Sequence, residues 1–205
     1  MSKIALTPNA SGTGVFTIAS PATSTDRTLT LPDEAGTVLT SASTANFPAG
    51  SVLQVVSYLT ATQGYQTITT SDSIINSITK VITPLGANSK FLVTVRWFGE
   101  INQGWDIPFN IHMDGVRVNI DGQGRGYGLA MAAISYGDIN DASTPDTLNI
   151  STLVSTSSVV GTAITFSLVA DSTVSRTLWN NRCFNIPSGN TEAGTSEMII
   201  TEIGG

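Results

Sequence analysis

The side chains that most often carry catalysis are few in this sequence. His112 is the only histidine and Cys183 the only cysteine among 205 residues, so neither a zinc site of several histidines nor an intrachain disulfide is expected. His112 would have to be the base of any serine hydrolase, but a predicted hairpin places it beside Arg117, whose charge disfavours an imidazolium. We therefore interpret His112 as a surface strand residue and Cys183 as a small buried apolar group.

The carboxylates form no recognisable catalytic pair. Glycosidases need two carboxylates about 5 to 10 Å apart. The five glutamates are scattered through predicted turns and strand ends: Glu34, Glu100, Glu192, Glu197 and Glu202. A pair could still converge in the fold, so polysaccharide degradation stays open as an alternative. Otherwise the sequence predicts no enzyme and no cofactor.

Two loops contain groups that could bind an ion. Asp138, Asp141 and Asp146 share one loop, and hard oxygen ligands of this kind suit Ca²⁺, but their spacing does not match the 12-residue calcium loop. A solvated turn is the favoured interpretation. The run from Gly122 to Gly128 resembles a phosphate-binding loop only superficially, because it follows a hairpin and lacks a βαβ setting. We expect no metal or nucleotide site.

Loop aromatics are the one feature that suggests ligand binding. Trp105 and Trp179 lie next to amide side chains, and Tyr127 lies in the glycine-rich loop. Flat rings flanked by amides suit sugars, through stacking and hydrogen bonds. Packing at a subunit interface is an equal alternative, because interfaces are also rich in aromatics.

The composition predicts which elements position these residues. Ser and Thr supply 52 positions and Gly another 19, which favours strands and turns over helices. Only 12% of the residues are charged, and the net charge of -6 would repel phosphate backbones, so nucleic-acid binding is not expected. The chain shows neither a signal peptide nor 18 consecutive apolar residues, which predicts a soluble, reducing compartment without membrane insertion.

Residues 46–205 show strong strand patterns. The segment 51–59 is a candidate buried strand, and 91–98 places Phe91, Val93, Val95 and Trp97 on one core face. Further strands are expected at 163–170 and 197–203. About eight strands at this spacing predict an antiparallel β-sandwich, specifically a jelly roll.

The best local signal is a hairpin around Asp114-Gly115. A two-residue type I′ loop pairs Met113 with Val116 and His112 with Arg117, which places the large apolar side chains on one face. Residues 72–81 carry isoleucines at helical spacing, but their β-branched content favours a strand or turn.

Residues 1–45 form a different region. Phe16, Ile18, Leu29 and Leu31 lie in short segments separated by Pro and Gly turn signals, and they are too few for an independent core. We therefore predict a short extended arm that is ordered by sister chains, by a docking partner, or by both. Residues 41–46 act as a short linker.

The arm segments 14–21 and 27–40 resemble the N-terminal part of tail-fibre and other virion structural proteins of bacteriophages, especially those of marine and cyanobacterial hosts. The blocks 49–56, 88–95 and 196–203 are similar to the C-terminal domains of such fibres. The resemblance implies an all-β, trimeric fibre or spike whose arm attaches to the particle and whose jelly-roll knob points outward. It carries over no catalytic residue.

These observations predict a virion structural protein that is made in the host cytoplasm. Its partners would be two further copies, capsid or tail proteins at the arm, and a host surface glycan or protein at the knob. Two alternatives remain: a head decoration protein that stabilises the capsid, and a stand-alone carbohydrate-binding module that uses Trp105, Tyr127 and Trp179.

Overall fold

The computed structural model describes 5, 7–31, 33, 35–36, 47–101, 106–118, 131–135, 144–184 and 192–205. The chain divides into two compact units, 1–36 and 37–205, and each is described by itself. In the described residues no helix is long and apolar enough to cross a bilayer.

Eleven strands and no helix are found among the described residues. They are β1 (Val52–Thr60), β2 (Gly64–Ile68), β3 (Ser73–Ile82), β4 (Lys90–Ile101), β5 (Asp106–Met113), β6 (Val116–Arg117), β7 (Ala132–Ser135), β8 (Asp146–Ser155), β9 (Ile164–Ala170), β10 (Arg176–Asn180) and β11 (Ser196–Ile203).

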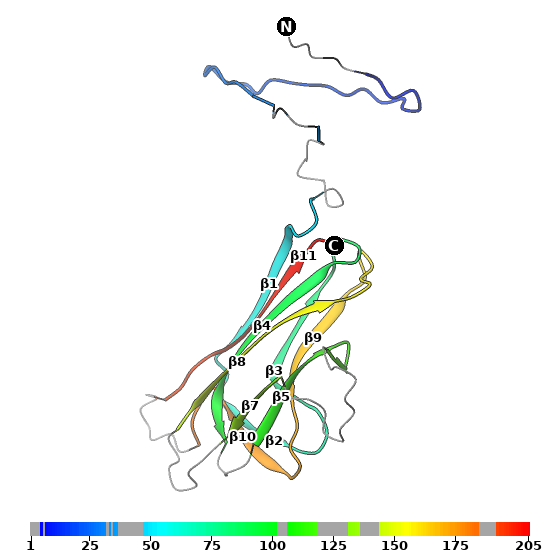
Figure 1. Cartoon of the computed structure of the whole chain (residues 1–205). Coiled ribbons are helices and arrows are strands. Elements are labelled where there is room, and N and C mark those ends of the chain that lie inside the picture. The colour runs from blue at the N-terminus through cyan, green and yellow to red at the C-terminus, as the bar shows by residue number, and fades with distance from the viewer. Residues whose placement is uncertain are drawn as a thin grey trace. The chain divides into compact units, whose positions relative to one another are not determined.

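The strands form two antiparallel sheets (Figure 1). In the first sheet, β4 pairs with β8 on one side and with β11 and β10 on the other, while β11 pairs with β1 and β10 with β2. In the second sheet, β9 lies between β3 and β5, and the other edge of β5 pairs with β7 and β6. Five pairs are nested along the chain, because β1 pairs with β11, β2 with β10, β3 with β9, β4 with β8, and β5 with β7.

The core lies between the two sheets. Phe91, Val93, Val95 and Trp97 of β4 are all fully buried, as the alternating pattern predicts. Phe91 contacts Phe166 of the second sheet with ring centroids 5.7 Å apart, and Trp97 contacts another second-sheet ring at 5.2 Å. The prediction of an all-β antiparallel sandwich is therefore confirmed.

The predicted hairpin is confirmed in its register. Met113 pairs with Val116 and His112 with Arg117. The φ angles of Asp114 and Gly115 are 50° and 82°, and a type I′ turn requires positive values at both positions.

One strand prediction needs correction. The segment 51–59 was expected to be buried, but β1 lies at the edge of its sheet, so Val55 and Leu59 project into solvent while Val56 and Tyr58 pack against the core. The preference for a strand or turn over a helix at 72–81 is confirmed, because β3 covers Ser73–Ile82.

The helical spacing in β3 has a local cause. Asn76 and Ser77 have φ angles of 44° and 55°, and the pairing with β9 shifts register between Ile74 and Thr79. This irregularity lets Ile75 and Ile78, three residues apart, both be fully buried. A bulged strand therefore produced the apolar spacing that resembles a helix.

In the first unit, the described residues form no strand and are all exposed. The Phe16 side chain is 85% exposed and that of Leu29 is 87% exposed. Ile18 and Leu31 are exposed as well, and none of the four belongs to the hydrophobic core. The local order in this unit is a turn in which Gly12 N donates to Asn9 O at 3.1 Å.

Candidate functional site

An aromatic cluster lies on the outer face of the first sheet. Trp179 of β10 is in direct register with Tyr65 of β2, with ring centroids 5.9 Å apart and planes inclined by 32°. Phe184 meets Trp179 edge-on, at 4.8 Å and 87°. Tyr65 is 72% exposed, Phe184 is exposed and Trp179 is half-buried. We name Tyr65, Trp179 and Phe184 the aromatic platform.

Strand alternation forces Trp179 outward. Its neighbours Leu178 and Asn180 are buried, and Asn180 Oδ1 accepts a 2.8 Å hydrogen bond from Trp97 Nε1 in the core. Gly99 lies beside this pair, and a Cβ there would clash with the Trp179 carbonyl and the Trp97 ring. The core thus fixes the strand that carries the platform.

Glu100 holds the loop segments behind the platform. Its carboxylate is 1% exposed and accepts hydrogen bonds from Thr144 N and Thr144 Oγ1, both at 3.1 Å, and from Phe184 N. One buried carboxylate therefore ties the end of β4 to the residues before β8 and to the segment after β10. This arrangement fixes the backbone that carries the Phe184 ring.

The chemistry beside the platform is not nucleophilic. Burial, followed by a hydrogen bond with the Glu192 side chain, raises the pKa of the Cys183 thiol to about 12, so the sulfur stays protonated. The prediction that Cys183 is buried is confirmed. Burial and the nearby Glu100 also raise the pKa of Asp146, which lies at the start of β8.

Glu100 and Glu202, the two fully buried glutamates among the described residues, do not form the pair that a glycosidase requires. Glu202 is in register with Phe91, nine residues along β4 from Glu100, which corresponds to about 30 Å. That separation is several times the distance between paired catalytic carboxylates.

A polar cluster lies on the outer face of the second sheet. Arg117 binds Asp72 and also Asp171, the latter at 2.7 Å, and His112 Nε2 lies 3.1 Å from Asp72 Oδ2. His112 is only 8% exposed, so its interpretation as a surface residue is wrong. Its burial follows from these contacts, which a strand pattern alone does not reveal.

The geometry around His112 does not activate a serine. Ser167 is its cross-strand neighbour, but the Ser167 hydroxyl pairs with Thr79 Oγ1 at 3.1 Å. The imidazole instead interacts with Asp72 and with the Gly115 backbone. Burial and the charge of Arg117 lower the pKa of His112 despite the opposing effect of Asp72. A neutral imidazole held by these contacts connects β5 to Asp72 and has a structural role.

Several predicted site residues cannot be placed. Trp105 and Tyr127, the glycine-rich run 122–128, Asp138 and Asp141 lie outside the described residues. Within the part that the structure describes, no group of three or more His, Cys, Asp or Glu side chains could share a metal ion.

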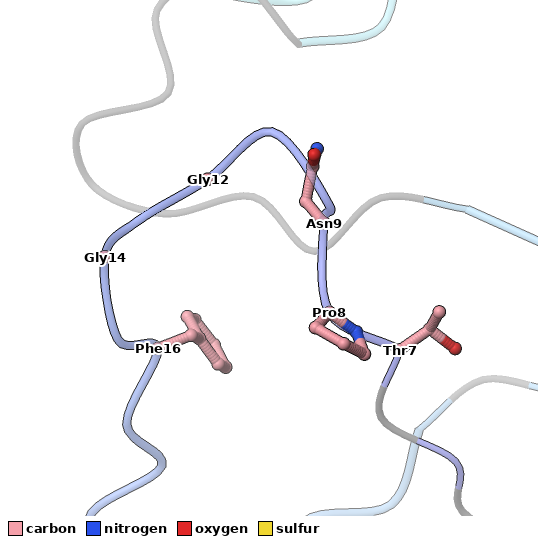
Figure 2. A pocket seen from close by; sticks show the side chains of 6 residues that line it. All are labelled: Thr7, Pro8, Asn9, Gly12, Gly14 and Phe16. Atoms are coloured by element: carbon pink, nitrogen blue, oxygen red, sulfur yellow. The ribbon is translucent and has the colours of Figure 1, made fainter.

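The first unit contains an open hollow of about 500 Å³. Figure 2 shows the Phe16 ring directed toward Pro8 across the bend that contains Gly12. The lining side chains are all exposed, so the hollow lacks the buried walls typical of a ligand pocket. Phe16 therefore packs against no buried side chain of the described first unit.

Sequence reasoning found Trp179 but missed Tyr65 and Phe184. Tyr65 alternates with the inward residues Gln66 and Ile68 in a short strand, but the pairing of β2 with β10 joins segments more than 100 residues apart. No local turn signals that pairing.

Comparison with known proteins adds no relative. No protein-family model matches the chain, and no curated protein is similar enough to count as a match.

Proposed function

We propose that the protein is a structural protein of a bacteriophage particle. In this proposal it forms a trimeric fibre or spike, with residues 1–45 as the arm that attaches to the particle. Residues 46–205 form a jelly-roll knob that contacts the host surface. The proposal includes no catalytic step.

The exposed apolar side chains of the first unit carry the proposal. Phe16, Ile18, Leu29 and Leu31 all face solvent in the single chain. Burial of such a side chain contributes about 1.5 to 3 kcal/mol, and the described residues of the first unit form no core in which to obtain that energy. Contacts with sister arms and with the particle would supply it.

The strand pairing supports a jelly-roll knob. The pair β1–β11 encloses β3–β9 along the chain, which encloses β4–β8, which encloses β5–β7. This order is expected when one long antiparallel hairpin is rolled into two sheets. Viral coat domains are among the proteins that use this architecture. The sequence resemblance of the arm and of the sandwich blocks to phage fibres supports the same class.

The end of the sandwich at which β1 begins is also apolar. Phe47, Leu53, Leu85 and Val160 line a hollow of about 220 Å³ there, and Phe47 and Val160 are exposed. This surface would offer a further contact between copies of the sandwich.

Localisation on the particle tests the proposal. Antibodies raised against the full chain should label intact particles of the phage that encodes it, and the soluble protein should inhibit adsorption to the host. Absence of the protein from purified particles would contradict a virion role.

Deleting the gene for this protein from the phage distinguishes a role in host attachment from a role in capsid decoration. For the proposed fibre we expect that the particles stay intact but no longer adsorb to the host. Loss of particle integrity with normal adsorption would instead show a head decoration protein.

A further inference from the structure

The outer face of β2 and β10 has an unusual composition for an exposed sheet surface. Its outward positions are Tyr65 and Thr67 on β2, and Thr177 and Trp179 on β10, and the two threonines pair directly in register. None of these four side chains is charged. Two rings therefore lie beside two hydroxyl groups on one surface.

The platform is open to a ligand. Among the described strands, β2 ends the strand order of its sheet, so none of them pairs with it on the side of Tyr65 away from β10. Tyr65 is largely exposed, whereas Trp179 is held by the core and Phe184 by Glu100. A fixed ring next to an accessible ring costs little conformational entropy when a ligand binds.

We propose that the aromatic platform binds a neutral carbohydrate. The apolar C–H face of a pyranose would pack against Tyr65 and Trp179, while Thr67 and Thr177 would hydrogen-bond to its hydroxyl groups. The net charge of -6 and the uncharged platform favour a neutral sugar over an acidic one.

A second copy of the chain fits this surface less well. A subunit contact buries a wide apolar area, but the platform consists of three aromatic residues bordered by threonines. Exposed aliphatic side chains that suit self-association lie in the arm, around Phe47, and on β1 and β8 of the same sheet.

The inference specifies the class of molecule that the proposed host contact would bind. It rests on the proposed function only for the origin of the sugar, namely the host surface. Binding itself is a property of the knob surface. It is tested on the purified full chain, so its failure would leave the arm-based assembly proposal standing.

The experiment uses an array of bacterial surface polysaccharides, followed by titration calorimetry with the strongest neutral binder. We expect Tyr65→Ala to weaken that binding by about tenfold, which corresponds to about 1.4 kcal/mol, and Tyr65→Phe to retain most of it. Trp179→Ala should cost at least as much, with its fold checked by circular dichroism.

Leu153→Ala is the matched control, because Leu153 is an exposed apolar residue on the same sheet, away from the platform. It should bind as the wild type does. Absence of binding to any neutral glycan, or equal binding by wild type and Tyr65→Ala, would overturn the inference. So would a Tyr65→Ala variant that loses self-association instead, since the platform would then be a subunit contact.

Discussion

Phe16 in the first unit and Phe91 in the sandwich are the same residue type in opposite environments. Phe91 is fully buried against Phe166, whereas Phe16 is 85% exposed. The sandwich therefore buries its apolar side chains within one chain, whereas those of the described arm residues stay exposed. The proposed assembly rests on this contrast.

The largest expected effect comes from removing a core ring. Trp97→Ala deletes a fully buried side chain that contacts Phe109 and donates to Asn180, so the free energy of unfolding should fall by about 3 to 5 kcal/mol in urea. Phe16→Ala is the control from the arm and should change the unfolding free energy of the sandwich itself, measured on the dissociated chain, by less than about 0.5 kcal/mol, because Phe16 is not part of the sandwich core. A comparable loss in both variants would abolish the contrast.

A buried carboxylate should give the next largest effect. Glu202 is fully buried and accepts hydrogen bonds from Leu85 N, Gly86 N, Ser89 Oγ and Gln54 Nε2. Glu202→Gln leaves donors without an acceptor and should cost about 2 to 3 kcal/mol in urea unfolding.

Glu197→Gln on the same strand is the control for Glu202. Glu197 is only half-buried, and the change should stay within about 0.5 kcal/mol. If Glu202→Gln proved equally mild, the loop 83–89 would not depend on this carboxylate.

Acid should weaken the sandwich through His112. Its pKa is lowered below 6.5, so the unfolded chain takes up a proton before the folded chain does. The free energy of unfolding should therefore fall as pH drops from about 7 through the folded pKa.

Two carboxylates continue this trend at lower pH. Burial alone would raise the pKa of Glu202 and Asp72, but hydrogen bonds to Glu202 and the Arg117 partner of Asp72 outweigh it and lower both values. Their stabilising contribution is present above about 4.5 and is lost as pH falls through the folded values.

The variant His112→Gln separates the effect of the histidine on stability from the effects of the carboxylates. In urea unfolding, its free energy of unfolding should change less between pH 7 and 5 than that of the wild type, and it should still fall at lower pH. An unchanged slope between pH 7 and 5 would show that His112 does not titrate differently in the two states.

Local patterns predicted the parts of the fold that depend on neighbouring residues. The period of two in β4 and the turn chemistry at Asp114-Gly115 each determined faces and register correctly. The exposure of β1 and the burial of His112 depend on strand order and on Asp72, which lies 40 residues away from His112. Local patterns do not encode such contacts.

The candidate site shows the same limit. Trp179 was recognisable as an aromatic beside amides, but its partners come from the distant β2 and from a segment held by Glu100. Cross-strand pairing over this separation becomes visible only in the folded chain.

Sedimentation velocity of the full chain at micromolar concentration tests the central claim most directly. We predict a species of three times 21.4 kDa, and dissociation to a folded monomer when both Phe16 and Leu29 are changed to Asp. A wild-type chain that sediments as a monomer would contradict the account, and so would a double variant that remains trimeric.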